Sequence, residues 1–546
     1  MPSFNLTSEP WLPCTWIGRA GAEEVSLQEA LLRAHEVREL GDPSPLVTVA
    51  LHRLLLAAVH RVYNGPPDVP SWERIWRRGA FDAAQVRDYL DRWRDRFDLF
   101  ADDYPFYQVA GLSFEYEAPI SRLVHEAASG NNPTLFDHSL DSAPAALSPA
   151  QAARYLVAQQ AFGIGGLVSF EKGQDPKVYK SADNAPLVKG AVALVKGPSL
   201  FHTLLLNLHR YNPAEGVPFA PAVDEGADGP AWEAEEPTRA EDRWPRGYLD
   251  LLTWQSRRVR LHPELDEAGR IVVRRAVIMK GYQFPDGFQR QGRETMLAFT
   301  KRLKANAGED PWPAVAFEEG RALWRDSLSL LQSVSEKRRH PQTLAWLGTL
   351  VSHGAIDRAA TLPVDFCGLA TDRAKVLFWR HERLPVPAAY LQDDGLVGAL
   401  DRALALAEKV AGVLQTSART LAQLVEAPDS DRPGGRRADP DAVRQLAQGL
   451  APERRYWPAL EVPFRKLLLD LPADRSEEDG LVTYGENRLR EWAETLGRAA
   501  RTAFSQTASG LDGSPRTLKA VAVAEGQFHR QLGATLKHYA EHTGEV

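Results

Sequence analysis

A run of glycines directly behind a helical segment is the first pattern that could do chemistry. In AQQAFGIGGLVSFEKG, residues 158–173, Gly163, Gly165 and Gly166 surround Ile164. Glycine often ends helices, so a plain helix C-cap is the default interpretation. The alternative is a backbone that approaches the minor groove of DNA, which is only ~6 Å wide and excludes most side chains.

Two adjacent arginines inside an apolar strand pattern form a second candidate. Arg274 and Arg275 lie in RIVVRRAVIMKG, residues 270–281. Neighbouring residues on a strand point to opposite faces, so we expect one of the two to face a partner. An exposed arginine on an edge strand, which deters aggregation, is the other interpretation.

A polar turn forms a third candidate. In GLATDRAKVLFWRHE, residues 368–382, the pattern places Thr371, Asp372 and Arg373 in a turn before a short strand. Aspartate is common in turns, so a hairpin turn without further function is the simpler interpretation.

A stripe of arginines lies close to the end of the sequence. Arg488, Arg490, Arg498 and Arg501 fall within one helical pattern, several at a spacing of three or four residues. Such a stripe can follow a phosphate backbone. A solvated helix face, on which these arginines alternate with Asp and Glu, is the more usual alternative.

Several familiar catalytic and metal-binding motifs are missing from the sequence. No GxxxxGK[ST], GxSxG or HExxH occurs, and Val168 stands where a dinucleotide fingerprint would need its last glycine. Cys14 and Cys367 are far apart, which argues against a thiolate zinc site or a disulfide framework and fits a reducing cytoplasm. We therefore expect no metal and no cofactor.

Composition limits how the chain can meet nucleic acid. The net charge is −7, with 65 Lys and Arg against 72 Asp and Glu. Bulk electrostatics would not hold DNA on such a chain, so local basic patches must do so. The N-terminus has no signal-peptide pattern and no run of about 18 apolar residues occurs, which predicts a cytoplasmic protein without a membrane partner.

Helix and strand signals alternate over most of the chain and predict a large mixed α/β domain over residues 1–390. Ser26 with Glu29, and Ser148 with Pro149, are helix N-cap signals. Runs at 256–264 and 270–281 predict a β-hairpin. A segment rich in Pro, Gly and acidic residues, about 215–247, is interpreted as an insertion at the surface.

The last part of the chain has a different pattern. Four long amphipathic segments predict an antiparallel four-helix bundle over residues 391–546; they cover residues 395–427, 440–471, 486–508 and 514–543. Pro458 and Pro463 are expected to break or kink the second segment. The fold class is therefore α+β, with the mixed domain followed by the bundle.

Several of these segments, in this order, resemble one family: the large subunit, CasA, of the type I-E Cascade complex, an RNA-guided CRISPR surveillance machine. FNLTSEPWLP resembles the family's opening arm, SGNNPTLFD its long loop and AQQAFGIGG its glycine loop. GYLDLLTWQSRRVRL and RAKVLFWRHE resemble two further segments. The resemblance covers nearly the whole chain.

The resemblance implies a non-enzymatic subunit of antiviral defence. Such a subunit recognises a protospacer-adjacent motif in duplex DNA from the minor groove and wedges the duplex open to start R-loop formation. It then helps to recruit a helicase–nuclease. Its implied partners are double-stranded target DNA, the 5′ handle of the crRNA, the other Cascade subunits and that helicase–nuclease.

The resemblance also assigns residues to these tasks. Gly163 to Gly166 with Ile164 would face the groove, and Arg274, with Arg275 as a rival, replaces the family's lysine finger. Arg373 stands where the family's wedge can carry a glutamine. The full assignment adds Thr371, Asp372 and Ala374 to the wedge, Asn131, Asn132 and Phe136 to the loop that docks onto the RNA handle and neighbouring subunits, and Arg488, Arg490, Arg498 and Arg501 to the displaced strand.

Two other functions stay open on the sequence alone. A cytoplasmic, glycosidase-like enzyme would use a cleft lined by tryptophan and carboxylates, and would show a deep pocket with convergent perturbed acids. A protein-interaction scaffold would leave Arg274 and Arg373 dispensable for DNA binding. The DNA-reading subunit predicts instead an open, positively charged surface with glycines at its rim.

Overall fold

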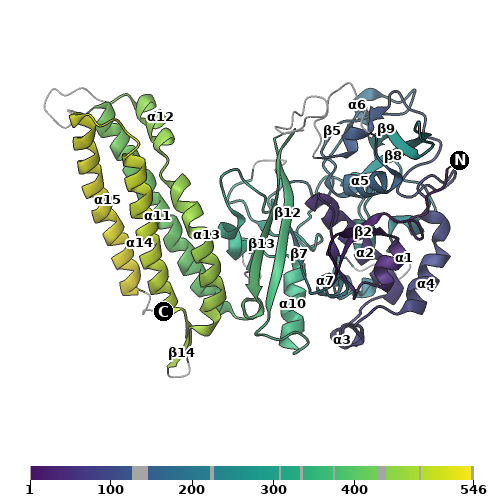
Figure 1. Ribbon diagram of the computed structural model, residues 1–546, viewed down its shortest axis with the longest axis horizontal. Helices are drawn as coiled ribbons and strands as arrows, with labels where there is room; N and C mark the ends of the chain where they lie inside the picture. The colour runs from purple at the N-terminus through teal and green to yellow at the C-terminus, as the bar shows by residue number, and fades with distance from the viewer. Residues whose placement is uncertain are drawn as a thin grey trace. The chain divides into compact units, whose positions relative to one another are not determined.

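A computed structural model describes residues 2–125, 146–221, 227–305, 309–331, 336–372, 375–427, 438–478 and 481–542. The chain divides into two compact units. The first unit comprises Met1–Glu319, Gln332–Arg358 and Leu362–Leu384, and the second comprises Gly320–Leu331, Ala359–Thr361 and Pro385–Val546. The predicted mixture of helices and strands is confirmed (Figure 1).

The first unit holds most of the strands and the shorter helices. Its helices are α1 (Leu27–Leu32), α2 (Pro45–Tyr63), α3 (Val69–Arg78), α4 (Ala83–Arg92), α5 (Pro149–Phe162), α6 (Pro176–Tyr179), α7 (Leu200–Asn207), α8 (Tyr248–Leu252) and α10 (Gln342–Ser352), with short 3₁₀ turns η1 (Arg94–Arg96), η2 (Ile120–Leu123), η3 (Pro213–Glu215) and η4 (Ala231–Glu233). Its strands are β1 (Leu12–Trp16), β2 (Ala22–Val25), β3 (Val37–Leu40), β4 (Ala118–Pro119), β5 (Gly166–Leu167), β6 (Ser181–Ala182), β7 (Val192–Val195), β8 (Arg257–Leu265), β9 (Ile271–Lys280), β10 (Phe299–Thr300), β11 (Arg338–Arg339), β12 (Thr361–Asp372) and β13 (Lys375–Pro387), whose last residues enter the second unit.

Helix α2 forms the centre of the first unit. Ser44 caps its N-terminus and accepts a hydrogen bond from the Val47 amide, and Pro45 occupies the first turn. The helix packs against α4, α5, α7 and α8. Among the described residues it is the one helix long and apolar enough to cross a membrane, but 78% of that stretch is buried inside the protein. It is therefore a core helix.

The sheets of this unit are small. Their strand orders are β2-β1-β3, β4-β9-β8 and β13-β12-β7, with the pairs β5-β6 and β10-β11. The predicted hairpin is confirmed: β8 pairs antiparallel with β9, from Arg257 opposite Lys280 to Leu265 opposite Ile271. Strand β12 pairs antiparallel with β7, with Cys367 opposite Val192.

The segment about 215–247 is not simply a surface insertion. Trp232 is buried, and the buried Asp228 carboxylate accepts hydrogen bonds from the Leu249 and Asp250 amides at the start of α8. The sequence pattern missed this because Pro, Gly and acidic residues usually mark solvent-exposed loops. Here one of the acids satisfies the N–H groups of a helix N-terminus.

The second unit is dominated by helices. They are α9 (Ser327–Leu331), α11 (Asp394–Glu426), α12 (Pro440–Leu450), α13 (Glu453–Asp470), α14 (Glu486–Ala508) and α15 (Pro515–His542), with turns η5 (Leu323–Asp326), η6 (Ala388–Leu391) and η7 (Leu471–Ala473) and the strand pair β14 (Arg475–Glu478) and β15 (Leu481–Tyr484). Helix α11 packs against α12, α13, α14 and α15. Figure 1 shows α11, α13, α14 and α15 side by side, in green to yellow.

Two sequence expectations differ from this unit. Pro458 and Pro463 do not break helix α13, which runs from Glu453 to Asp470, and the break lies earlier, between α12 and α13, where Ala451 has a φ of 29°. Residues 320–331 were expected in the first domain, yet Trp324 stacks on Phe464 of α13 with ring centroids 4.5 Å apart. Burying the Trp324 indole against α13 stabilises residues 320–331 in the second unit.

Candidate nucleic-acid interface

The glycine loop, residues 163–166, begins where α5 ends. Ser148 and Gln151 form a capping box at the start of α5, and Gly163 caps its C-terminus by donating its N–H to the Gln159 carbonyl. A Cβ at Gly163 would lie 2.5 Å from that carbonyl oxygen. The C-cap interpretation is therefore confirmed for Gly163, which is buried and needs glycine because of this close approach.

The next two glycines turn the chain into a short hairpin. The Gly165 N–H donates to Asn184 Oδ1 at 2.8 Å. Gly166 has a φ of 140°, in the region that favours glycine, and pairs with Ala182 across β5 and β6. Ile164, Gly165 and Gly166 are half-buried, and Leu167 is 64% exposed. The outer side of this hairpin is therefore open, although its first glycine lies inside the protein.

A buried arginine, Arg257, binds the backbone of this loop on its inner side. The sequence interpretation missed this residue. Arg257, at the start of β8, is 1% exposed. Its Nη2 donates to the carbonyls of Gly163 at 3.2 Å, Ile164 at 2.9 Å and Asp183 at 2.7 Å. Burial lowers the pKa of its guanidinium to about 10. The loop is thus fixed through its backbone, from 94 residues away along the chain.

Further buried polar groups support Arg257. The Gln160 side chain accepts from the Arg257 N–H and donates to the Arg257 carbonyl, both at 2.9 Å. Burial, together with the Arg257 charge, lowers the pKa of His125 to about 4. Buried polar groups outside an obvious motif carry no local sequence signal, so only a fold can reveal this network.

The glycine loop and strand β12 rest on one apolar cluster. Its buried members include Phe162 at the end of α5 and Cys367 and Leu369 of β12, and Ile164 packs against it. A Cβ at Gly368 would lie 2.3 Å from the Gly190 carbonyl, so β12 runs directly against the chain beside it. The structure therefore brings the glycine loop close to the strand that leads to the predicted wedge.

The predicted wedge is described only in part. Thr371 and Asp372 are the last residues of β12, not a turn, and β13 is a long strand rather than a short one. Asp372 suggested a turn, yet it still belongs to β12. Burial alternates residue by residue along β13, as expected for a long strand with one exposed face. Arg373 and Ala374 lie outside the described residues, as do Asn131, Asn132 and Phe136 of the predicted docking loop.

Arg274 and Arg275 lie on β9, at some distance from the glycine loop. Arg274 pairs with Glu264 and Arg275 pairs with Glu117, each at 2.7 Å. Ser169, just after the loop, bridges to Met279, five residues from Arg274 and hence about 17 Å along the strand. The structure does not place these arginines at the loop, and a partner must compete with carboxylates for them.

The arginines of α14 differ from one another in their surroundings. Arg488 pairs with Glu491 at 2.9 Å, whereas among the described residues the acidic partners of Arg490 and Arg498 lie 3.8 and 3.9 Å away. Arg498 lines a groove together with Arg455 of α13 and the polar side chains of Thr495 and Gln506. Arg501 is exposed on the same helix.

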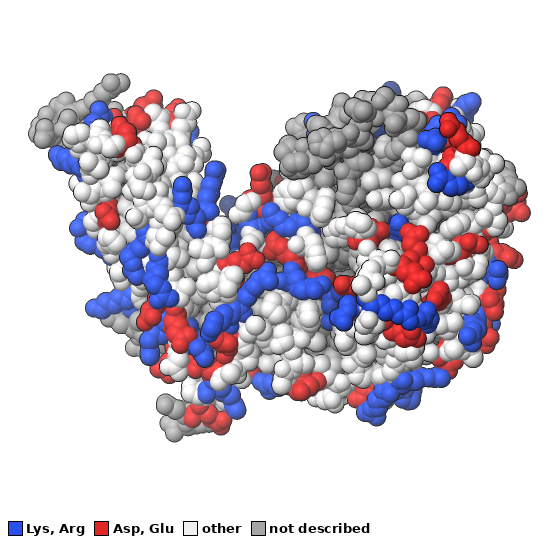
Figure 2. All heavy atoms as spheres, in the orientation of Figure 1, with Lys and Arg blue, Asp and Glu red and all other residues white. Residues whose placement is uncertain are grey.

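The charges on the surface do not form one wide basic patch. On the face shown in Figure 2, Lys and Arg side chains form narrow bands beside Asp and Glu. The expected open, positively charged surface is therefore not seen on this face. Among the described residues, no group of three or more His, Cys, Asp or Glu side chains could hold a metal ion.

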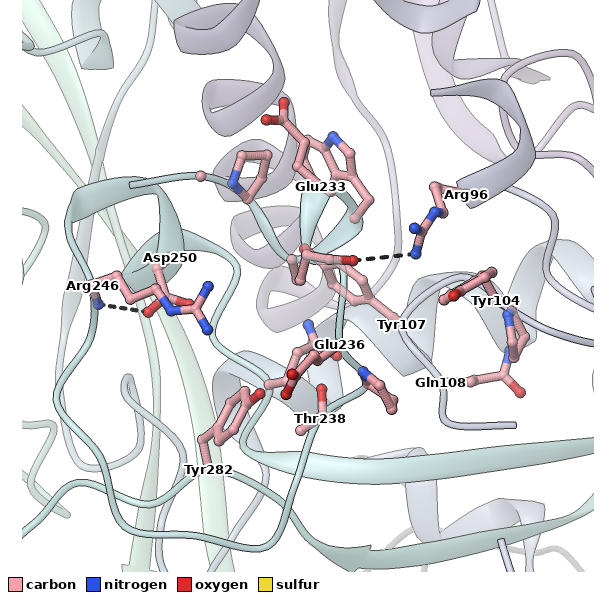
Figure 3. A pocket seen from close by; sticks show the side chains of 18 of the residues that line it. Arg96, Tyr104, Tyr107, Gln108, Glu233, Glu236, Thr238, Arg246, Asp250 and Tyr282 are labelled. Atoms are coloured by element: carbon pink, nitrogen blue, oxygen red, sulfur yellow. Dashed lines mark hydrogen bonds between the residues drawn. The ribbon is translucent and has the colours of Figure 1, made fainter. Parts of the chain in front are cut away.

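A separate pocket in the first unit tests the alternative of an enzyme. The cavity has a volume of about 180 Å³ and is lined by Trp232, Glu233, Asp228 and Asp250, among others (Figure 3). Burial raises the pKa of Asp228, but this carboxylate caps α8. Figure 3 also shows Arg246 beside Asp250, to which its amide donates.

Two further carboxylates of this pocket, those of Asp250 and Glu233, are bound to other groups as well. Arg243 contacts both oxygens of Asp250, at 2.6 and 2.9 Å. Arg61 contacts both oxygens of Glu233, and Tyr89 donates to the same group. A general acid or base needs a carboxylate that can reach a substrate, and these carboxylates serve the fold instead. Asp228, Glu233 and Asp250 therefore give no support to a glycosidase-like site.

Comparisons with known proteins agree with one another. The family described as CRISPR-associated protein Cse1 matches residues 5–503. The CasA/Cse1 protein of Thermus thermophilus is 37% identical over 549 residues, which cover 98% of each chain.

Solved structures give the same result. The crystal structure of Thermus thermophilus CasA has a TM-score of 0.77 at 33% identity, covering 98% of this chain and 100% of that one. Acidimicrobium ferrooxidans Cse1 has a TM-score of 0.78 at 27% identity, covering 99% of each chain. A chain of a CRISPR RNA-guided surveillance complex, at 21% identity and a TM-score of 0.73, shares the fold over 97% of this chain and 100% of its own.

Proposed function

Because the chain belongs to the Cse1 family of CRISPR-associated proteins, we propose that it is the non-enzymatic large subunit of a type I-E, RNA-guided surveillance complex. In this role it reads a short motif in duplex DNA from the minor groove and opens the duplex beside it, so that R-loop formation begins. Base pairing with the guide RNA then reads the remaining sequence.

The observation that carries this proposal is the way the glycine loop is held. Its carbonyls at Gly163 and Ile164 bind Arg257 inside the protein, while Gly165, Gly166 and Leu167 lie on the outer side. A backbone without bulky side chains can approach a narrow groove. Because the loop is fixed from behind, it can do so without losing its shape.

Reconstitution tests the proposal. The purified chain is added to a crRNA-loaded complex that lacks its large subunit, and binding of motif-bearing duplex is measured. We expect the chain to restore this binding, whereas a duplex with a scrambled motif stays unbound. If the chain joins the complex without restoring binding, the proposed role is wrong.

A pair of charge substitutions tests the loop itself. Gly165→Asp is a poor probe, because a Cβ there lies 3.1 Å from the Ala182 carbonyl and the Asn184 amide and would disturb the hairpin. Leu167→Asp puts a negative charge on an exposed side chain beside the loop and should weaken motif binding at least tenfold. Val178→Asp, on the exposed α6 of the same segment, is the matched control. Equal affinities of both variants would contradict the role of the loop.

The wedge is proposed at Thr371, Asp372, Arg373 and Ala374. Separating the first base step costs roughly 1.4 kcal/mol, which one inserted side chain can offset. Arg373→Ala should impair strand opening more than initial docking, measured by the fluorescence of a base analogue beside the motif. Normal opening by this variant would remove the wedge assignment.

The other assignments are also proposals. Arg274 or Arg275 would contact the groove after release from its glutamate, and Asn131, Asn132 and Phe136 would dock onto the 5′ handle of the crRNA and neighbouring subunits. Helices α11, α13, α14 and α15, with α12 and α13 together as the second segment, would form the antiparallel four-helix bundle expected for the family. Other Cascade subunits and a helicase–nuclease would be its protein partners, in the cytoplasm and without a cofactor.

For the displaced strand, the geometry favours part of the predicted arginine stripe. Arg498 lines the groove between α13 and α14 with Arg455, whereas Arg488 is held by Glu491. A cation with a close carboxylate partner has less to gain from a phosphate. We therefore assign the strand contact first to Arg455 and Arg498 and only second to the exposed Arg501 on the same helix as Arg498.

A further inference from the structure

One face of strand β13 is exposed along most of its length. Lys375, Leu377, Trp379, His381 and Arg383 are all exposed, while the residues between them are half-buried. Leu377 is 58% exposed and Trp379 is 44% exposed. Alternate residues of a strand share a face, so these five form one row, which we call the β13 row.

The opposite face of β13 is covered. The Arg380 guanidinium lies over the rings of Phe378 and Phe317, 4.9 and 5.8 Å from their centroids. It also donates to the Glu318 carbonyl at 3.4 Å. In the strand order β13-β12-β7, β13 is moreover an edge strand. The exposed row therefore belongs to the outer face of a sheet edge that the described residues leave open.

The charges of the β13 row are held in place. Arg383 contacts both oxygens of Asp365, at 2.5 and 2.9 Å, and His381 Nε2 lies 3.3 Å from the same carboxylate. Asp365 is the buried member of this group, whereas about half of the Arg383 side chain stays exposed. Lys375 is exposed at the other end of the row. The row thus presents an apolar centre between the exposed Lys375 and an arginine that Asp365 already pairs.

Resting on the proposed function, we propose that the β13 row binds a single strand of the opened DNA. Bases stack on exposed aromatic side chains and phosphates pair with cations, which is how single strands bind without sequence preference. Neighbours in the row are about 6.6 Å apart. Trp379 can stack on a base only where that base has left the duplex. The row begins at Lys375, so a strand separated at the hairpin would meet it at once.

Charge complementarity favours nucleic acid over a second protein strand. A protein partner would cover the apolar centre equally well, but it would have to bury Lys375 against a matching acid, whereas Arg383 already pairs with Asp365. Each phosphate of a nucleic acid supplies that charge. The row also reaches the hairpin end, where strand separation is proposed.

The first test uses the full chain alone and labelled oligodeoxythymidylate, with binding followed by fluorescence anisotropy. Trp379→Ala should weaken binding by roughly 5- to 100-fold, the range of one lost base stack. Trp379→Phe retains a stacking surface and should recover most of the affinity. Trp244→Ala removes a tryptophan of similar exposure elsewhere in the first unit and should leave binding unchanged. Equal affinity of the Trp379→Ala variant and the unchanged chain would overturn the proposal.

The second test uses the reconstituted complex and target DNA in which 5-iododeoxyuridine replaces thymidine beside the motif. Irradiation should crosslink this base to the peptide that contains Trp379, and only in DNA that carries the motif. If Trp379→Ala instead keeps the chain from joining the crRNA-loaded complex, with oligonucleotide affinity unchanged, the row is a protein interface and the proposal is wrong. If the chain fails to restore target binding but oligonucleotide binding still depends on Trp379, only the proposed function fails.

Discussion

At the scale of the residue, the most informative side chain is Arg257. It is a fully buried cation that binds only carbonyl oxygens, from Ser256, Gly163, Ile164 and Asp183, among the contacts described. Burying a charge without a carboxylate partner is costly. Charge-assisted hydrogen bonds to several carbonyls offset part of this cost. The protein therefore accepts a lower free energy of unfolding in exchange for a glycine loop with a fixed shape.

Arg257→Met tests this. It keeps an apolar stem but removes the donor to the Ile164 and Asp183 carbonyls, whereas the Gly163 carbonyl keeps the Ala185 N–H. Each orphaned buried group costs about 1–3 kcal/mol. We expect the free energy of unfolding to fall by about 2–4 kcal/mol and amide hydrogen exchange over residues 163–167 to speed up. Motif-dependent DNA binding should fall as well.

The control for that variant is Arg154→Met, on helix α5, which leads into the glycine loop. Arg154 is also buried and donates to the Trp11 carbonyl at 2.8 Å, near the other end of the helix. It should lower stability without faster exchange in the glycine loop. If both variants change the exchange of residues 163–167 equally, Arg257 has no special role there.

At the scale of the element, the long helices of the second unit contain two kinds of glycine. One lies at a close helix–helix contact, and the other has room for a larger side chain. Gly412 lies within the 33-residue helix α11, and a Cβ there would meet nothing within 4 Å. Gly497 of α14 differs, because a Cβ would lie 3.0 Å from Leu536 of α15. Packing therefore requires a glycine at position 497 but not at position 412.

Gly412→Ala should therefore stabilise the protein by about 0.5–1 kcal/mol, because alanine restricts the unfolded chain and favours helix. Gly497→Ala should give no gain, since Leu536 would have to move. Chemical denaturation monitored by circular dichroism measures both. A gain of the same size in the two variants would contradict the packing described for α14 and α15.

The groove between α13 and α14 makes its own prediction. The double change of Arg455→Glu with Arg498→Glu should weaken binding of target DNA that contains an unpaired strand. It should also reduce the slope of log affinity against log salt by about 1.4, or about 0.7 for each lost phosphate contact of a single strand. Arg488→Glu with Arg490→Glu is the matched pair on the same helix and should change the slope less. An unchanged slope in the first pair would exclude the groove.

At the scale of the whole molecule, four histidines, three of them buried and His125 half-buried, make stability depend on pH. Burial lowers the pKa of His52 and His209 to about 3 and of His60 and His125 to about 4. In the unfolded chain a histidine titrates near pH ~6.5. Below that pH the unfolded state binds more protons than the folded state, so stability falls as the pH drops toward about 4.

Thermal melting at about pH 7.5 and about pH 5.5 measures this effect. Each buried imidazole should remove about 1 kcal/mol of stability at the lower pH, so the melting temperature should fall clearly. His60→Gln should reduce the difference between the two conditions, because one titrating group is gone. A melting temperature that does not change over this range would contradict the burial of these rings.

Features that depend on neighbouring residues could be predicted from the sequence. Features that depend on contacts between distant parts of the chain could not. Local signals succeeded: Ser26, Ser148 and Pro149 cap helices as expected, and the β8–β9 hairpin forms where strand patterns flank a turn. The contact of Arg257 with Gly163 joins residues 94 positions apart and leaves no local pattern.

The same limit explains the other differences. The burial of Asp228 depends on α8, which begins about twenty residues further along the chain, and the packing of Trp324 depends on α13. Arg274 lies far from the glycine loop because the chain just after the loop contacts Met279, near the C-terminal end of β9. Each of these was fixed by tertiary contacts rather than by the residues next to it.

The way in which Arg257 grips the glycine loop has a practical consequence for engineering. Its hydrogen bonds go to peptide oxygens, which every amino acid possesses, and so they do not depend on which side chain position 164 carries. New residues at the exposed Leu167 can therefore be screened for altered target preference while the scaffold beneath the loop is retained. Directed evolution of the contact surface need not start by rebuilding the platform that carries it.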